Sequence, residues 1–174
     1  MTRRLLLALA ISALFPIDAA ADIGTRSLKE IREEGVIIQQ WDASCAAAAL
    51  ATVFTFAFSD PVSERDVASG MLNYTQPLRV RHRGGFSMLD MKRYVEGRGY
   101  KAVGLAGMSF DDVRYFQSPI VPITVKGYSH YVVIKGVDAD GNVFLADPAF
   151  GNRSMSRARF EAVWNDGMVF AIRE

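Results

Sequence analysis

The stretch ASCAAAALATVFTFAF, residues 43–58, decides the fold of this chain of 174 residues. It is apolar on every side and rich in Ala, a strong helix former, so it predicts a helix that is buried all round rather than an amphipathic surface helix. Other elements must enclose such a helix, and we expect it to be the central helix of the domain. Its first turn contains Cys45, the only cysteine of the chain.

Shorter helices are expected on both sides of this stretch. Ser27 and Glu30 have the spacing of a capping box and predict a helix over residues 25–35. A second helix is expected from Asp60 to about Leu72, and Ser87 with Asp90 caps a third. The basic segment RVRHRGG, residues 79–85, lacks interleaved aromatic residues and a periodic basic face, so we interpret it as a solvated loop between two helices.

After Gly99 the pattern changes to short apolar runs separated by Gly, Asp and Pro, which is typical of strands. DADG, residues 138–141, predicts a hairpin that makes the strands before and after it antiparallel neighbours. Helices first and strands second favour an α+β domain, with a helical half packed on an antiparallel sheet. The five expected strands are KAVGL (101–105), PIVPITVKG (119–127), HYVVIKGV (130–137), NVFLAD (142–147) and MVFAIR (168–173), with short helices at 109–116 and 156–164.

Length and composition limit the classes of function. A chain of this length forms one compact domain and has no room for a second catalytic module such as an ATPase. The formal net charge of +1 implies no field for nucleic acid. One cysteine excludes an intramolecular disulfide, and two histidines with one cysteine argue against a metal site. We therefore expect neither metal nor cofactor, and we also expect a monomer.

The first residues are typical of a targeting segment rather than of the folded domain. Arg3 and Arg4 precede an apolar run from Leu5 to Phe15, and small residues follow, with Ala21 as the expected cleavage point. Residues 1–21 thus predict a secretory signal peptide, and residues 22–174 the mature domain. The alternative is an uncleaved membrane anchor. Export, which we expect to be to the periplasm, makes a lone thiol an unusual residue to keep for packing alone.

Four residues could together form a catalytic site. Cys45 in the first turn of the buried helix faces unpaired backbone N–H groups and the positive end of the helix dipole, and both favour a thiolate. His130 opens one strand of the hairpin, and Asp147 ends the other, close enough to orient the imidazole. Gln39, six residues before Cys45, could donate its amide to an oxyanion beside the Cys45 N–H.

Each residue alone also has a plainer explanation. A buried Cys is often a small hydrophobic residue, a strand His can simply be hydrogen-bonded, and Asp before Pro forms turns. The order of a helix-terminal Cys, a strand His and a neighbouring strand-end Asp favours the catalytic interpretation. Four aromatic residues near the site in sequence could line a substrate groove or belong to the core: Trp41, Phe86, Tyr128 and Phe150.

The segments QQWDASCAAAAL, SHYVVIKGV and VFLADPAFG resemble the papain-like cysteine peptidases that process bacteriocins and other double-glycine leader peptides. The resemblance runs from about Val36 to Glu174. It implies a papain-like fold, Cys45 as nucleophile, His130 as general base and acid, Asp147 as the orienting residue and Gln39 as oxyanion donor. It also implies a peptide or protein substrate with small residues before the scissile bond. Exported, stand-alone members of this type resemble the peptidase encoded with secreted functional-amyloid systems, so secreted proteins of the same operon are the expected substrates.

One departure from the family pattern concerns Ala46, where the family usually has Gly directly after the nucleophile. Two other functions stay open at this point. A peptide-binding module could keep the fold without the chemistry, and a Cys-His-Asp acyl-transfer enzyme, such as an amidase or cross-linker, could use the same residues.

Overall fold

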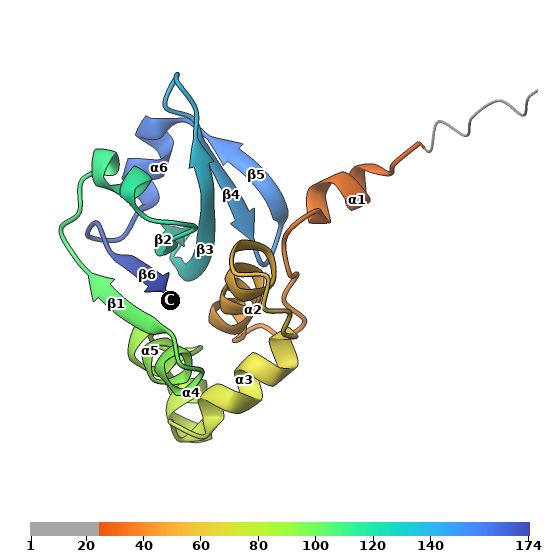
Figure 1. Ribbon diagram of the computed structural model, residues 1–174. Helices are drawn as coiled ribbons and strands as arrows, with labels where there is room; N and C mark the ends of the chain where they lie inside the picture. Colours follow the sequence, from red (N-terminus) through yellow and green to blue (C-terminus); the bar gives the residue numbers. More distant parts are fainter. Residues whose placement is uncertain (1–24) are drawn as a thin grey trace, which may run out of the picture.

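A computed structural model of the chain describes residues 25–174, and the predicted signal peptide, residues 1–21, lies outside the described residues. Helices fill the first half of this range and strands the second (Figure 1). The helices of the first half are α1 (Leu28–Glu33), α2 (Cys45–Thr52), η1 (Val53–Ala57), α3 (Glu64–Leu72), α4 (Pro77–Arg83) and α5 (Met88–Gly97). The second half contains β1 (Lys101–Leu105), η2 (Phe110–Tyr115), β2 (Ile120–Val125), β3 (Tyr128–Val137), β4 (Val143–Asp147), β5 (Gly151–Met155), α6 (Arg157–Val163) and β6 (Val169–Arg173).

The strands form one antiparallel sheet in the order β1-β6-β2-β3-β4-β5. All five expected strands are present, and β3 and β4 pair as the hairpin predicted. β5 was not predicted, because GNRSM has no apolar alternation and becomes a strand by pairing along the whole of β4.

Helices cover both faces of the sheet, and a separate apolar cluster lies between the sheet and the helices on each face. Helices α2 and α5 pack on one face, with α3 against both of them, and Val133, Ala146 and Phe170 of the sheet share one cluster with Leu50 and Phe54 of the helical half. On the other face η2 and α6 pack over the alternate strand residues. This period of two along the strands brings both clusters to the sheet.

α2 is the central helix, as expected, and every one of its residues from Cys45 to Thr52 is buried. The expected burial does not extend to the end of the predicted stretch. The chain changes to a π-helix over Val53–Ala57, and Phe56 is 53% exposed. Within the predicted stretch, complete burial therefore begins at Cys45 and does not reach Phe56.

Two helix boundaries differ from the prediction. The segment at 79–85 is not a loop: Pro77 opens α4, and Gly84 ends it in the left-handed conformation. Burial of Val80 anchors this helix, while its basic residues face outward, except that Arg83 pairs with the buried Asp90 at 2.6 Å. The helix expected from Asp60 begins only at Glu64, where Ser63 caps it.

Within residues 25–174, none of the helices combines the length and the apolar character needed to cross a membrane.

The Thr52 hydroxyl links the central helix to the segment that leads to the site. Its Oγ1 accepts the Ile37 N–H at 2.9 Å and donates to the Ala48 carbonyl at 2.8 Å. We expect Thr52→Val, which keeps the shape, to lower the free energy of unfolding by about 1–3 kcal/mol, because the Ile37 N–H loses its partner. Urea denaturation measures this loss.

Thr55→Val is the matched control, since the Thr55 hydroxyl makes only longer contacts, at 3.3 and 3.4 Å, with Val62. Equal losses in the two variants would contradict the role given to Thr52.

Candidate active site

Cys45 is the first residue of α2 and lies where this buried helix approaches the surface, with 9% of the residue exposed. Ser44 precedes it, and both the N–H and the hydroxyl of Ser44 donate to the Trp41 carbonyl, at 3.2 and 2.6 Å. The sulfur therefore sits at the positive end of the helix dipole, on a backbone that these bonds hold in place.

His130 and Asp147 form a close pair. His130 Nε2 lies 2.7 Å from Asp147 Oδ1, and the Asp147 side chain is fully buried whereas that of His130 is 16% exposed. The paired register of β3 and β4 ends at Val133 and Ala146, so the two side chains meet just beyond the ladder. The Ala149 N–H also donates to Asp147 Oδ1, at 2.9 Å. The carboxylate thus has a fixed orientation toward the imidazole.

The charges of these groups support one another. Burial lowers the pKa of His130, but hydrogen bonds to Asp147 and Cys45 and the charges of both groups outweigh it and raise the pKa to about 9. Burial raises the pKa of Asp147, but the hydrogen bond and charge of His130, the Ala149 N–H and the charge of Arg153 hold it below its usual value. At neutral pH the pair is therefore an imidazolium beside a carboxylate, and the Cys45 side chain is a second hydrogen-bond partner of the same imidazole.

Gln39 lies on the loop that leads into α2. Its Nε2 donates to the Trp41 carbonyl at 3.0 Å, the same oxygen that receives both bonds from Ser44, so the amide lies next to the residue before Cys45. The Gln39 N–H donates to the Pro148 carbonyl at 2.8 Å, which ties this loop to the residue after Asp147. An amide nitrogen carries two hydrogens, and one remains for a further acceptor.

Two residues near the site were not singled out from the sequence. Glu64, which is 4% exposed, accepts the Gln40 N–H with both carboxylate oxygens, at 3.0 and 3.1 Å. Arg153 Nη2 lies 2.7 Å from Asp147 Oδ2. Charged residues in the first turn of a helix and in a short strand usually face water, so the sequence carried no signal that would have singled out either residue.

The four aromatic residues do not form one group. Phe86 is buried and belongs to the core, as the plainer explanation had it. Trp41, Tyr128 and Phe150 are 43, 79 and 64% exposed, and the Arg65 guanidinium lies over the Trp41 ring at 5.4 Å. These three side chains are available to a ligand.

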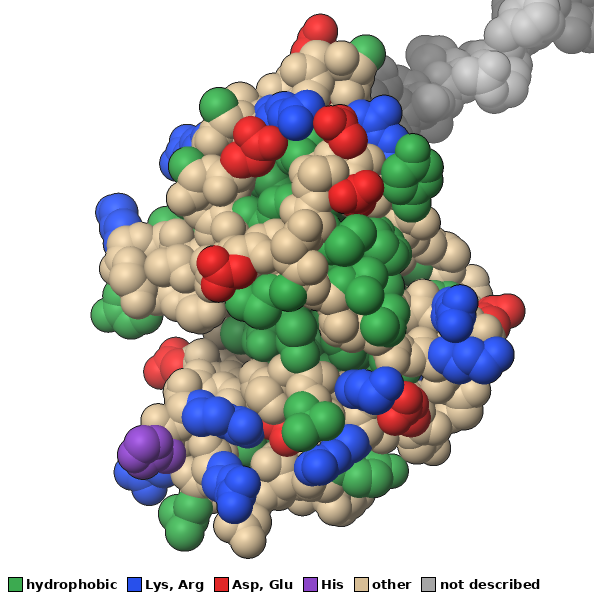
Figure 2. Space-filling view, turned by 90° about the vertical axis from the view of Figure 1, so that its left-hand side faces the viewer, with side chains coloured by type: hydrophobic (Ala, Val, Ile, Leu, Met, Phe, Trp, Pro, Cys, Tyr) green, Lys and Arg blue, Asp and Glu red, His purple; other side chains and the backbone are tan. Residues whose placement is uncertain are grey.

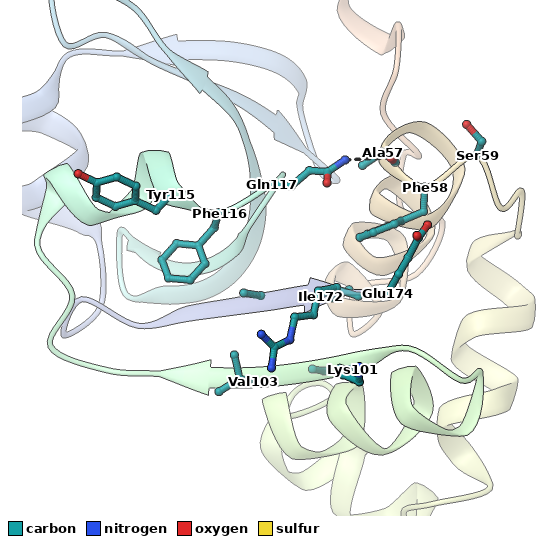
Figure 3. Close-up of a pocket in the computed structure, with 13 residues that line it drawn as sticks. Ala57, Phe58, Ser59, Lys101, Val103, Tyr115, Phe116, Gln117, Ile172 and Glu174 are labelled. Carbon is teal, nitrogen blue, oxygen red and sulfur yellow. Dashed lines mark hydrogen bonds between the residues drawn. The ribbon is translucent and has the colours of Figure 1, made fainter.

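A hollow of about 710 Å³ lies at the opposite end of the central helix, about 20 Å from Cys45 by the rise of a helix. Figure 3 shows Phe58 after η1, Phe116 near η2 and Ile172 on β6 around it, with Gln117 donating to the Ala57 carbonyl at 3.1 Å. The face of the molecule that lies on the left-hand side of Figure 1 has apolar side chains in its middle and a group of Lys and Arg side chains below them (Figure 2). The hollow is thus separate from the groups around Cys45.

No three His, Cys, Asp or Glu side chains within residues 25–174 come together as a set that could hold a metal ion.

Comparison with known proteins matches residues 33–174 to the model of the peptidase C39 family. The chain belongs to this family. Among other C39-like proteins, it is 39% identical over 148 residues to a "Probable functional amyloid protease FapD" of Pseudomonas aeruginosa, covering 84% of this chain and 64% of that protein. The protein of the same name from Pseudomonas fluorescens is 40% identical over 165 residues, covering 94% of this chain and 71% of the relative.

Solved structures of similar C39 domains confirm the predicted α+β, papain-like fold. A double glycine motif protease from an AMS/PCAT transporter, in complex with the leader peptide, superposes with a TM-score of 0.64 at 21% identity, over 79% of this chain and 89% of that one. The peptidase domain of Streptococcus ComA gives 0.62 at 22% identity, over 79% and 96%.

Ala46, where the family resemblance predicted a Gly, is fully buried and belongs to the cluster between the helices and the sheet. The extra carbon is therefore accommodated as part of the core of the helical half.

The raised pKa of His130 makes the stability of this C39 chain depend on pH. The folded-state pKa of about 9 exceeds the unfolded value of 6.5, so the stabilisation is fully present below about pH 6.5 and is lost as pH rises through 9. We expect the free energy of unfolding to fall between these values, as measured by urea denaturation at successive pH. His130→Gln should remove the decline.

His82→Gln, which changes the other histidine, on the exposed side of α4, should retain it. The same decline in all three proteins would show that it does not come from the site.

Proposed function

We propose that the chain is an exported cysteine endopeptidase. The observation that carries this proposal is the approach of the His130 and Asp147 pair, 2.7 Å apart, to a cysteine at the start of a buried helix. In this reaction the Cys45 thiolate attacks a peptide carbonyl and forms a carbon–sulfur bond. The His130 imidazolium gives its proton to the departing amine, and a thioester remains.

Hydrolysis of the thioester completes the cycle. His130, now neutral, takes a proton from water, whose oxygen attacks the thioester carbonyl and releases the carboxyl product and the Cys45 sulfur. The Gln39 amide and the Cys45 N–H stabilise the oxyanion in both halves of the reaction. Asp147 holds the imidazole and balances its charge, and the chemistry needs neither metal nor cofactor.

The substrate is a peptide or protein, cleaved after small residues, in a secretion or amyloid-assembly pathway. The names of the two Pseudomonas relatives support this pathway, and the leader peptide bound by the transporter protease supports small residues before the scissile bond. We further propose that residues 1–21 are removed as a signal peptide, that the mature protein acts as a monomer in the periplasm, and that secreted proteins of the same operon are its substrates.

Co-expression of the chain with those secreted proteins tests the function. We expect new peptide termini, identified by mass spectrometry, with the wild type and none with Cys45→Ala, because no other thiol is present in the chain. His82→Gln should cleave like the wild type. Identical fragments with Cys45→Ala would rule out the proposed peptidase activity. Cross-linked or deamidated products without new termini would indicate an acyl-transfer enzyme instead.

The role of Gln39 is tested on a peptide that spans the mapped cleavage site. Gln39→Ala should lower kcat by about 10²–10³-fold with little change in KM, since the amide acts on the oxyanion and not on the bound substrate.

Gln40→Ala is the matched control, because Gln40 is bound to Glu64 through its backbone N–H and its side chain is not used. If both variants lose the same activity, the loss comes from the loop and the oxyanion role is wrong.

A further inference from the structure

Arg153 approaches the buried end of the catalytic pair from β5. In the register of β4 and β5 it lies opposite Leu145, two residues before Asp147 and on the same face of the sheet. Its Nη2 is 2.7 Å from Asp147 Oδ2, while Oδ1 of the same carboxylate faces His130. Each oxygen of Asp147 thus has its own cationic neighbour.

The contact between Arg153 and Asp147 is an ion pair rather than an aligned hydrogen bond. Asp147 Oδ2 and Arg153 Nε are both buried without a hydrogen-bond partner among the described residues. The Phe150 ring lies 5.5 Å from the guanidinium, and only 28% of the Arg153 side chain is exposed. Burial raises the pKa of Asp147, and the Arg153 charge is one of the contacts that lower it, beside the hydrogen bond and charge of His130 and the Ala149 N–H.

We propose that Arg153 is a positioning residue of the active site, whose charge keeps Asp147 ionised and turned so that Oδ1 faces His130. The proposal rests on the proposed function of Cys45, His130 and Asp147. With Arg153 the charges alternate along the site, from guanidinium to carboxylate to imidazolium. Without Arg153 the fully buried carboxylate would have one counter-ion instead of two, and both its ionised form and its orientation would be less stabilised.

β5 does not need this contact to stay in the sheet. Its residues pair with β4 from Val143 to Asp147, and Asn152 Nδ2 donates to the Glu34 carbonyl at 2.6 Å. Loss of the Arg153 charge should therefore affect the site more than the strand.

Three variants separate charge from shape. Arg153→Gln and Arg153→Met remove the charge, and Arg153→Lys keeps it. We expect Arg153→Gln and Arg153→Met to lower kcat about tenfold or more with KM nearly unchanged. An effect of this size is typical when a residue that orients a site residue is removed. The acid limb of the pH–rate profile should move to higher pH, because Asp147 loses a cation that lowers its pKa. Lysine should restore most of both properties.

Arg157→Gln is the matched control, since Arg157 pairs with Asp111 and Glu161 on the surface of η2 and α6. Unchanged kcat and an unmoved acid limb in Arg153→Gln would overturn the proposal, as would a Lys variant as impaired as the Gln variant. If Arg153→Gln does not fold, the comparison of Arg153→Met with Arg153→Lys tests the proposal by the same criteria.

NMR titration of the His130 ring makes the test independent of cleavage. The transition of Asp147, seen through its hydrogen bond to His130, should move to higher pH in Arg153→Gln and stay in place in Arg157→Gln. If the wild type cleaves nothing, the proposed function fails while this titration still decides whether Arg153 controls Asp147.

Discussion

Helix α2 is enclosed by α3 and α5 on one side and by β3 on the other, and this enclosure gives its first residue a fixed place. A helix that is buried along its whole length can neither rotate nor slide without opening voids in the core. Cys45 is therefore presented to β3 by a rigid element rather than by a loop. The segment before it is tied to the same helix through Thr52, and to the turn between β4 and β5 through the bond from Gln39 to the Pro148 carbonyl.

The sheet half supplies a buried negative charge that has to be neutralised. A carboxylate out of water costs several kcal/mol unless charges and hydrogen bonds surround it, and Asp147 receives His130, Arg153 and the Ala149 N–H. The contacts that make this burial tolerable are also those that set the charge and orientation of His130. The stability of the site and the charges of its groups thus depend on the same few interactions, which explains why the raised pKa of His130 and the lowered pKa of Asp147 occur together.

Local patterns in the sequence were enough to predict the central helix, the β3–β4 hairpin and the order of helices before strands. They failed where a partner distant in the sequence decides the structure. β5 is polar and forms because β4 offers it a ladder, and α4 forms because Val80 finds a place in the core beneath a basic surface. For the site, Cys45, His130, Asp147 and Gln39 were selected from their positions on expected elements. Arg153 and Glu64 could not be, because a charged side chain shows no sign in the sequence that its partner is buried.

The position of β6 in the sheet has a consequence for the order in which the strands can pair. This strand follows every other strand in the sequence, yet it pairs between β1 and β2, as the second strand from one edge of the sheet. Until it arrives, β1 with its attached α5 has no partner strand, and the sheet exists as two pieces. The six-stranded sheet is therefore complete only when Val169–Arg173 has paired with both neighbours, although the β2–β3–β4–β5 part of the sheet pairs without it.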